Sequence, residues 1–146
     1  MATATSNPKL DTQEKAMCKA INAFRAQNGK PPLKVSVALT RSAEWMAHDM
    51  AKHDNLDHVD SKGRDFDERM DDFGYTKPTK GENIAAGHSD AAATLAQWKA
   101  SPLHRAILLK SKLKVVGVGR ARNLNSDFEW FWTADFGGTV TKTMPI

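Results

Sequence analysis

The hydrophobic pattern of this sequence changes period near residue 110, and this change limits the folds available to the chain. Before that point apolar residues recur at helical spacing, whereas residues 114–121 (KVVGVGRA) and 128–136 (FEWFWTADF) alternate as strands do. In the second run most apolar residues share one face, but Phe131 points to the other. A strand that is apolar on both faces suits a sheet covered on both sides. The order of helices and then strands therefore predicts an α+β fold, a three-layer α-β-α sandwich around a small central antiparallel sheet.

Five helices are predicted before these strands. The first begins at Asp11, where Glu14 follows three residues later in the pattern of a capping box. The predicted helices cover residues 11–28, residues from 37 to about 53–55, and residues 65–73, 90–100 and 103–109. Gly117 and Gly119 alternate on one face of the first strand, so we expect another segment of backbone to approach that face closely.

The length of 146 residues predicts one domain, with a core large enough to be stable without disulfide cross-links. We expect a flexible lead-in over residues 1–10 and a single domain over residues 11–146. Cys18 is the only cysteine, so no internal disulfide is possible, and a packed position in the first helix is expected for it. No run of about 18 apolar residues is present, so no transmembrane segment is expected.

The lead-in has neither a charged n-region nor an apolar h-region, so no signal peptide is expected. A polar start would equally fit a mature form from which a signal had been removed. The net charge is +4, from 21 basic and 17 acidic residues mixed along the chain. Because nucleic-acid binding requires a concentrated basic face, the charge pattern predicts a solvated surface and no nucleic-acid partner.

Three of the five histidines follow one another at intervals of five residues, at 48, 53 and 58. This spacing turns successive side chains about 140° apart on a helix, so they do not form a metal-binding array. We expect His48 and His88 to face solvent. His53 continues the apolar stripe of its helix, so we expect it to be hydrogen-bonded at the helix end.

His58 and His104 differ because both are predicted to lie just beyond helices, in short irregular segments where functional side chains concentrate. Pro102 disfavours helical geometry in Ser101 and so turns the chain immediately before His104. Glu82 lies between the two histidines, in a Gly-Glu-Asn segment predicted to be a turn. Two imidazoles and one carboxylate suit either an open zinc site or an acid–base pair. Sequence spacing does not bring these residues together, so it leaves both readings open.

Several motifs occur in one order between residues 14 and 138: the segment that ends in HDNLDHVDSKG, then GENIAAG, WKASPLHRAIL, VVGVGRA and FWTADFGG. In this order they resemble the CAP superfamily of cysteine-rich secretory proteins, antigen 5 and pathogenesis-related group 1 proteins, and most of all its disulfide-free bacterial-type domains. The resemblance places the two family histidines at His58 and His104 and the family glutamate at Glu82. Many members carry a second glutamate three residues after the tryptophan that aligns with Trp98, but this sequence has Ser101 there.

The resemblance implies an extracytoplasmic binding domain with a ligand cleft at His58, Glu82, His104 and Ser101. It also implies lipid, sterol or a protein as partner classes and no agreed catalytic activity. His58, His104 and Glu82 are the predicted ligands of a divalent metal, with Zn²⁺ favoured by the imidazole nitrogens. With one carboxylate the site should be weak, and folding should not require the ion.

Two alternatives remain. The first is a hydrolase in which His58 or His104 is the general base and Glu82 orients it, or in which a bound metal activates water. Ser101 and Ser61 are its nearest candidate nucleophiles, although neither lies in a G-x-S-x-G motif. The second is an interaction module whose polar cluster is inert and whose aromatic residues form a partner surface, with Trp45 expected to be exposed.

Overall fold

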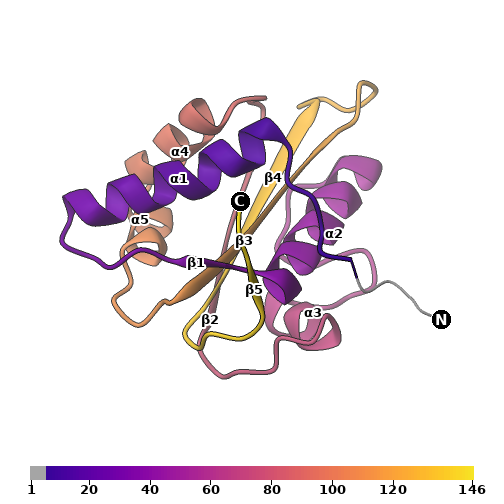
Figure 1. Cartoon of the computed structure of the whole chain (residues 1–146). Helices are drawn as coiled ribbons and strands as arrows, with labels where there is room; N and C mark the ends of the chain where they lie inside the picture. Colours follow the sequence, from indigo (N-terminus) through magenta and orange to yellow (C-terminus); the bar gives the residue numbers. More distant parts are fainter. Residues whose placement is uncertain (1–5) are drawn as a thin grey trace.

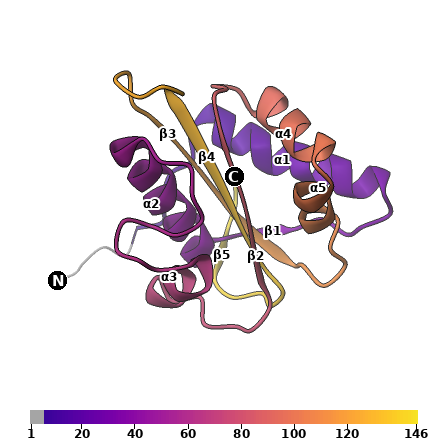
Figure 2. The same ribbon diagram turned by 180° about the vertical axis from the view of Figure 1, so that it is seen from behind.

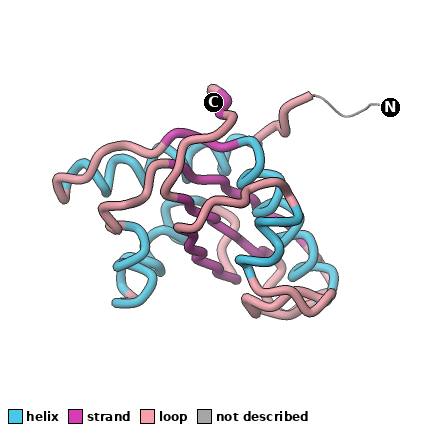
Figure 3. The backbone as a smooth tube through the Cα atoms, turned by 90° about the horizontal axis from the view of Figure 1, so that it is seen from below, coloured by secondary structure: helices cyan, strands magenta, loops and turns pink. Residues whose placement is uncertain are grey.

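The computed structural model describes residues 6–146 and contains a sheet between two layers of helices (Figures 1 and 3). Of the predicted lead-in, residues 1–5 lie outside the described part, and Leu10 is buried. The helices are α1 (Thr12–Gln27), α2 (Val37–His53), α3 (Phe66–Asp72), α4 (Ala91–Ala100) and α5 (Pro102–Leu108). The strands are β1 (Lys34–Ser36), β2 (Lys80–Ala86), β3 (Val115–Arg122), β4 (Trp130–Gly137) and β5 (Thr143–Met144). The predicted helices and the two long strands are confirmed to within two residues at most ends.

The helices divide between the two faces of the sheet, as expected for a sandwich. α1, α4 and α5 lie on one side of the strands and α2 and α3 on the other (Figures 1 and 2). Alternate side chains of β4 pack into the hydrophobic cores on the two faces of the sheet. Trp132 packs in the cluster with α1 and α4, whereas Phe131 packs against α2. The three-layer prediction is therefore confirmed. Within residues 6–146 no helix is long and apolar enough to cross a membrane.

The sheet has the order β2-β4-β3-β1-β5. β3 and β4 are adjacent and antiparallel as predicted, but β1 runs parallel to β3, so the sheet is mixed and not wholly antiparallel. The sequence pattern did not show β1 because three residues carry no measurable alternation. Its position is set by pairing with a strand that lies some 80 residues later in the chain, at Val115 and Val116.

β2 corrects the prediction that the Gly-Glu-Asn segment is a turn. All seven residues of β2 pair with β4, and Glu82 lies opposite Asp135. Glycine, glutamate and asparagine have low strand propensity, but pairing with a buried neighbouring strand overrides that preference. Glu82 is therefore held by a rigid element instead of a loop.

α2 packs directly on the backbone of β3, as the two glycines of that strand predicted. A Cβ atom on Gly117 would lie 2.1 Å from the backbone of Leu39, and one on Gly119 would lie 2.5 Å from the backbone of Glu44. Only a strand without side chains at these positions allows α2 so close to the sheet.

Some predicted positions of single side chains hold and others do not. Cys18 is buried, and His48 and His88 are exposed, as expected. His53, however, is exposed at the end of α2 and not part of the apolar stripe. The prediction for Trp45 is also wrong: it is half-buried between the Phe73 ring, 6.3 Å away, and the Arg64 guanidinium, 4.7 Å away. Phe128, assigned to the long strand, lies before β4 and is exposed.

We expect Gly117→Ala to lower the free energy of unfolding by about 3 kcal/mol, because the new methyl group meets backbone atoms of α2 that cannot move independently. Gly81→Ala is the matched control in β2. Its Cβ would meet only the side chain of Ile107, at an ordinary contact distance of 3.4 Å. Urea unfolding followed by circular dichroism measures both variants. Equal stability of the two would contradict the close approach of α2.

Candidate functional site

A buried guanidinium lies at the centre of the polar cluster. Arg69 of α3 is fully buried, and its Nη2 donates to Oε2 of Glu82 at 2.6 Å. Its Nη1 donates to Oδ2 of Asp135 at 3.1 Å and to Oγ of Ser42 at 3.2 Å. The two carboxylates come from paired positions on β2 and β4. One cation thus hydrogen-bonds two buried carboxyl groups and joins α3 to the sheet.

The electrostatics of this cluster are dominated by burial. Burial and the nearby charge of Glu82 raise the pKa of the Asp135 carboxyl well above its usual range, and the Arg69 charge opposes that rise. Asp60 adds a third carboxylate, with Oδ2 3.8 Å from Nε of Arg69. Because a buried charge without a partner is costly, Arg69 is required by the carboxylates around it.

Glu82 also holds His58. Its other oxygen, Oε1, lies 2.8 Å from Nδ1 of His58 in the loop between α2 and α3. An ionised carboxylate only accepts hydrogen bonds, so Nδ1 carries the proton and Nε2 of the neutral ring keeps a free lone pair. Burial lowers the pKa of His58; the Arg69 charge acts in the same direction, and the charges of Asp57 and Asp135 oppose it. The imidazole is therefore neutral at pH 7, and its side chain is 46% exposed.

His104 lies in the first turn of α5, inside the helix predicted over residues 103–109 and not in an irregular segment beyond a helix. Pro102 opens this helix at a position where proline is well accommodated. Ser101 makes no capping bond to the helix backbone; its Oγ lies 2.8 Å from Nδ1 of His104. Burial lowers the pKa of His104, and a positive charge on His58 lowers it further.

Neighbouring residues of β2 hold the two halves of the site. Glu82 faces the layer of α2 and α3, where it binds Arg69 and His58. Asn83 faces the opposite layer, and its Nδ2 donates to the main-chain oxygen of His104 at 3.1 Å. Successive strand residues point to opposite faces of a sheet. The Gly-Glu-Asn segment thus fixes one histidine from each helical layer at the same edge of the sheet.

A groove of about 420 Å³ lies beside His104 along this edge. β2 supplies one wall and α4 another, where Trp98 donates from Nε1 to the carbonyl of Ile84 at 3.0 Å. The groove is lined mostly by apolar side chains, among them Leu56, Ile84, Ala86 and Trp98. Ser101 and His104 are polar residues of its lining. The site thus combines two neutral imidazoles with an adjoining apolar hollow.

The structure brings the predicted site residues together in two pairs, Glu82 with His58 and Ser101 with His104. Their role in binding stays a prediction. Ser61 lies elsewhere, hydrogen-bonded through its amide and hydroxyl groups to Asp49. Sequence reasoning missed Arg69, which binds Glu82, and the three other side chains that contact Arg69: Asp135, Ser42 and Asp60. One signal for them was available, since an aspartate within the apolar run FWTADF must find a buried partner.

The donor set suits a two-imidazole metal site with a hydrogen-bonding carboxylate behind it. Within residues 6–146 no group of three or more His, Cys, Asp or Glu side chains is placed to hold a metal ion. Both oxygens of Glu82 already accept hydrogen bonds, so Glu82 orients His58 and does not itself face the cleft. His58 and His104 each have a free Nε2 that could bind an ion.

The fold and this site define a class of α-β-α domains with two histidines and a glutamate at one edge of the sheet. The sequence profile of the cysteine-rich secretory protein family, CAP, matches residues 18–136. The chain belongs to this family. With one buried cysteine, it is a disulfide-free member.

Two relatives from Bacillus subtilis (strain 168) match the sequence. The protein YkwD is 32% identical over 138 residues, which cover 93% of this chain and 51% of YkwD. The membrane protein YlbC is 29% identical over 108 residues, which cover 74% of this chain and 31% of YlbC. The chain therefore spans about half the length of YkwD and less of YlbC.

Solved structures confirm the fold. An outer surface protein from Borrelia burgdorferi aligns with a TM-score of 0.77 at 20% identity, over 90% of this chain and 98% of that one. An extracellular protein with an SCP domain from Bacillus anthracis (strain Ames) aligns with a TM-score of 0.76 at 24% identity, over 90% of this chain and 44% of that one.

We expect Arg69→Met to lower the free energy of unfolding by about 3–5 kcal/mol at pH 7, because it leaves the carboxylates of Glu82 and Asp135 buried without a counter-charge. Part of this loss should be recovered at pH 4.5, where protonated carboxyls need no cation. Arg122→Met removes a half-exposed partner of Glu129 and is the control, with an expected loss below about 1 kcal/mol. Urea unfolding of both variants at the two pH values measures this, and a loss that does not depend on pH would contradict the argument.

Proposed function

We propose that this chain is an extracytoplasmic binding domain whose cleft holds a divalent metal ion or a small ligand between His58 and His104. The observation that carries the proposal is the pair of half-buried neutral imidazoles. Each has Nδ1 engaged by a neighbour, and each has Nε2 without a partner within residues 6–146. Side chains held rigid with a free donor atom are suited to binding.

The family membership and the surroundings of the site support this reading. Two neighbours in fold are described as an outer surface protein and an extracellular protein, which favours a location outside the cytoplasm. The groove beside His104 offers apolar contact to a ligand whose polar end meets the imidazoles. A lipid, a sterol or a protein segment would satisfy this chemistry.

Zn²⁺ is the ion we propose, because imidazole nitrogen suits it better than it suits Ca²⁺ or Mg²⁺. His58 and His104 would ligate the ion, and Glu82 would fix the ring of His58. Bound there, the ion would supply Lewis acidity and open coordination positions for a ligand. Two protein ligands make weaker binding than the closed four-ligand sites that hold small domains together.

Calorimetric titration with Zn²⁺ at pH 7.5 and 5.5 tests the metal proposal. Protonated imidazole does not bind metal, so we expect affinity on the order of tenfold weaker at pH 5.5. Burial lowers the pKa of both histidines, so the loss of zinc binding should begin at a lower pH than for free imidazoles. The His58→Ala/His104→Ala variant should lose binding.

The control for this titration is His48→Ala/His88→Ala, which removes two exposed histidines and should bind as the wild type does. Zinc binding that survives the loss of His58 and His104, or that is the same at both pH values, would refute the site. Unfolding of the protein by a chelator would refute the separate claim that folding does not need the ion.

A second function, hydrolysis, is favoured by one observation. Ser101 Oγ lies 2.8 Å from an imidazole nitrogen of His104, the contact expected of a nucleophile and its base. No carboxylate of residues 6–146 hydrogen-bonds to His104, and its pKa is lowered, so it is a weak base without an orienting partner. Binding without turnover is therefore the function we propose.

We expect no turnover of p-nitrophenyl esters that depends on Ser101. The variant Ser101→Ala separates the two functions, because Ser101 makes no capping bond and its loss should leave stability within about 0.5 kcal/mol of the wild type. A hydrolysis rate that falls at least tenfold in Ser101→Ala and in His104→Ala would favour the hydrolase.

A further inference from the structure

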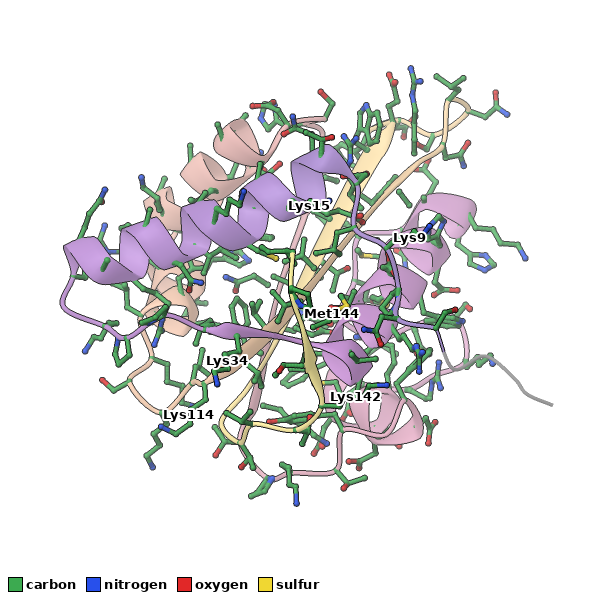
Figure 4. The ribbon with its side chains drawn as sticks, in the orientation of Figure 1. Lys9, Lys15, Lys34, Lys114, Lys142 and Met144 are labelled. Carbon is green, nitrogen blue, oxygen red and sulfur yellow. The ribbon has the colours of Figure 1, made fainter. Side chains whose placement is uncertain are left out.

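Five exposed lysines gather on the side of the molecule that carries β1 and β5. In the view of Figure 4 they lie around Met144, and we call them the lysine face: Lys9, Lys15, Lys34, Lys114 and Lys142. Two of them are neighbours through the backbone, since the Lys34 amide donates to the carbonyl of Lys114 at 3.0 Å. The carbonyl of Lys142 accepts from Val37, one residue after β1, at 3.0 Å.

No ion pair among the described residues neutralises the lysine face. Within residues 6–146 none of its five ammonium groups forms an ion pair, whereas Lys80 in β2 is bound by Asp67 and Asp71. Asp11 and Glu14, which lie between Lys9 and Lys15 in the sequence, both accept hydrogen bonds from Arg120. Residues 15–43, 110–126 and 136–146 contain no aspartate or glutamate. These three segments supply β1, β3, β5 and the part of α1 beyond its first turn. The whole sequence has 21 basic and 17 acidic residues, but these three segments carry basic residues and no acidic ones.

Apolar groups are exposed among these lysines. A hollow of about 170 Å³ has Lys34 and Lys114 in its lining, together with Pro31, Pro32 and Val140. The side chain of Val140 is 45% exposed. Lys34 also lines a larger hollow of about 380 Å³, between β1 and β5. Apolar side chains beside lysines are the chemistry of a protein surface that meets both headgroups and the start of acyl chains.

The residue types favour a lipid surface over other polyanions. The face is built from lysines, which act as mobile point charges and attract an anionic surface without fixed geometry. A single-stranded nucleic acid would require aromatic stacking platforms, and none of the residues that define this face or its hollows is aromatic. A soluble phosphate polymer would gain nothing from Val140.

We propose that the lysine face docks this domain on an anionic lipid bilayer, with Val140 at the level of the headgroups. The sheet order places β1 and β5 at one edge and β2 at the other. Docking through the lysine face therefore leaves the edge with His58 and His104 open to solvent. This inference does not depend on what the histidine cleft binds.

Co-sedimentation with vesicles tests the proposal. The wild type should bind vesicles of phosphatidylglycerol and phosphatidylcholine at 0.1 M NaCl, fail to bind pure phosphatidylcholine, and be released at 0.5 M NaCl by screening. Lys34→Glu/Lys114→Glu/Lys142→Glu should lower the partition coefficient on the order of a hundredfold. Lys34→Gln/Lys114→Gln/Lys142→Gln should have a partition coefficient between those of the wild type and the glutamate variant. It serves as the test variant if the glutamate variant does not fold.

The matched control is Lys52→Glu/Lys62→Glu/Lys77→Glu, which makes the same change in net charge on elements outside the lysine face. It should keep at least half of the wild-type binding, so an equal loss in both variants would show that net charge alone acts and would overturn the proposal. Binding to pure phosphatidylcholine as tight as to the anionic vesicles would also overturn it.

Val140→Ser distinguishes a bilayer from a soluble polyanion. Its partition onto anionic vesicles should fall severalfold, whereas its affinity for soluble polyphosphate should not change. Vesicle binding that is unaffected by Val140→Ser, together with polyphosphate binding as tight as vesicle binding, would assign the lysine face to a phosphate polymer instead. His58→Ala/His104→Ala should bind vesicles as the wild type does, so the test of this surface is separate from the test of the cleft.

Discussion

The geometry of the candidate site depends on one buried cation, the guanidinium of Arg69. Arg69 compensates the carboxylates of Glu82 and Asp135, and these residues come from α3, β2 and β4. A buried ion pair contributes little net stability once desolvation is counted, but its removal is costly because the remaining charge has no partner. The cluster therefore acts as a constraint on geometry: α3 has to lie where its guanidinium meets both carboxylates. That constraint in turn fixes Glu82 as an acceptor for His58.

β2 also positions the histidine of the other helical layer. Asn83 follows Glu82 and points to the opposite face, where it holds the main chain of His104 at the start of α5. Each histidine is thus oriented through a different residue of β2, from a different layer of the sandwich. The cleft and the lysine face lie at opposite edges of the sheet, so a ligand could enter one while the other is covered. The two surfaces are built from different chemistry, with neutral imidazoles in one and unpaired ammonium groups in the other.

Much of the fold could be predicted from local pattern. The helix with Asp11 and Glu14 at its start begins at residue 12 because the capping box satisfies backbone groups within one turn. The alternation in β4 predicted a sheet covered on both faces, and Gly117 predicted the close approach of α2. β1 and β2 could not be found in this way. Their residues have weak or absent strand patterns, and they are strands only because β3 and β4 offer them unpaired backbone groups.

The sequence by itself determined the helices, the two long strands and the layered architecture, because each depends on periodicity or on motifs within a short stretch of chain. Through the family resemblance it also predicted the candidate residues of the site. The tertiary structure alone decided how those residues work. It put Glu82 on a strand, engaged both oxygens of that carboxylate, and supplied Arg69 as the counter-charge. It also gathered lysines from segments more than 100 residues apart on one face. The contacts of Arg69 join residues that no spacing rule relates, and they are strong because burial has removed water from between the charges.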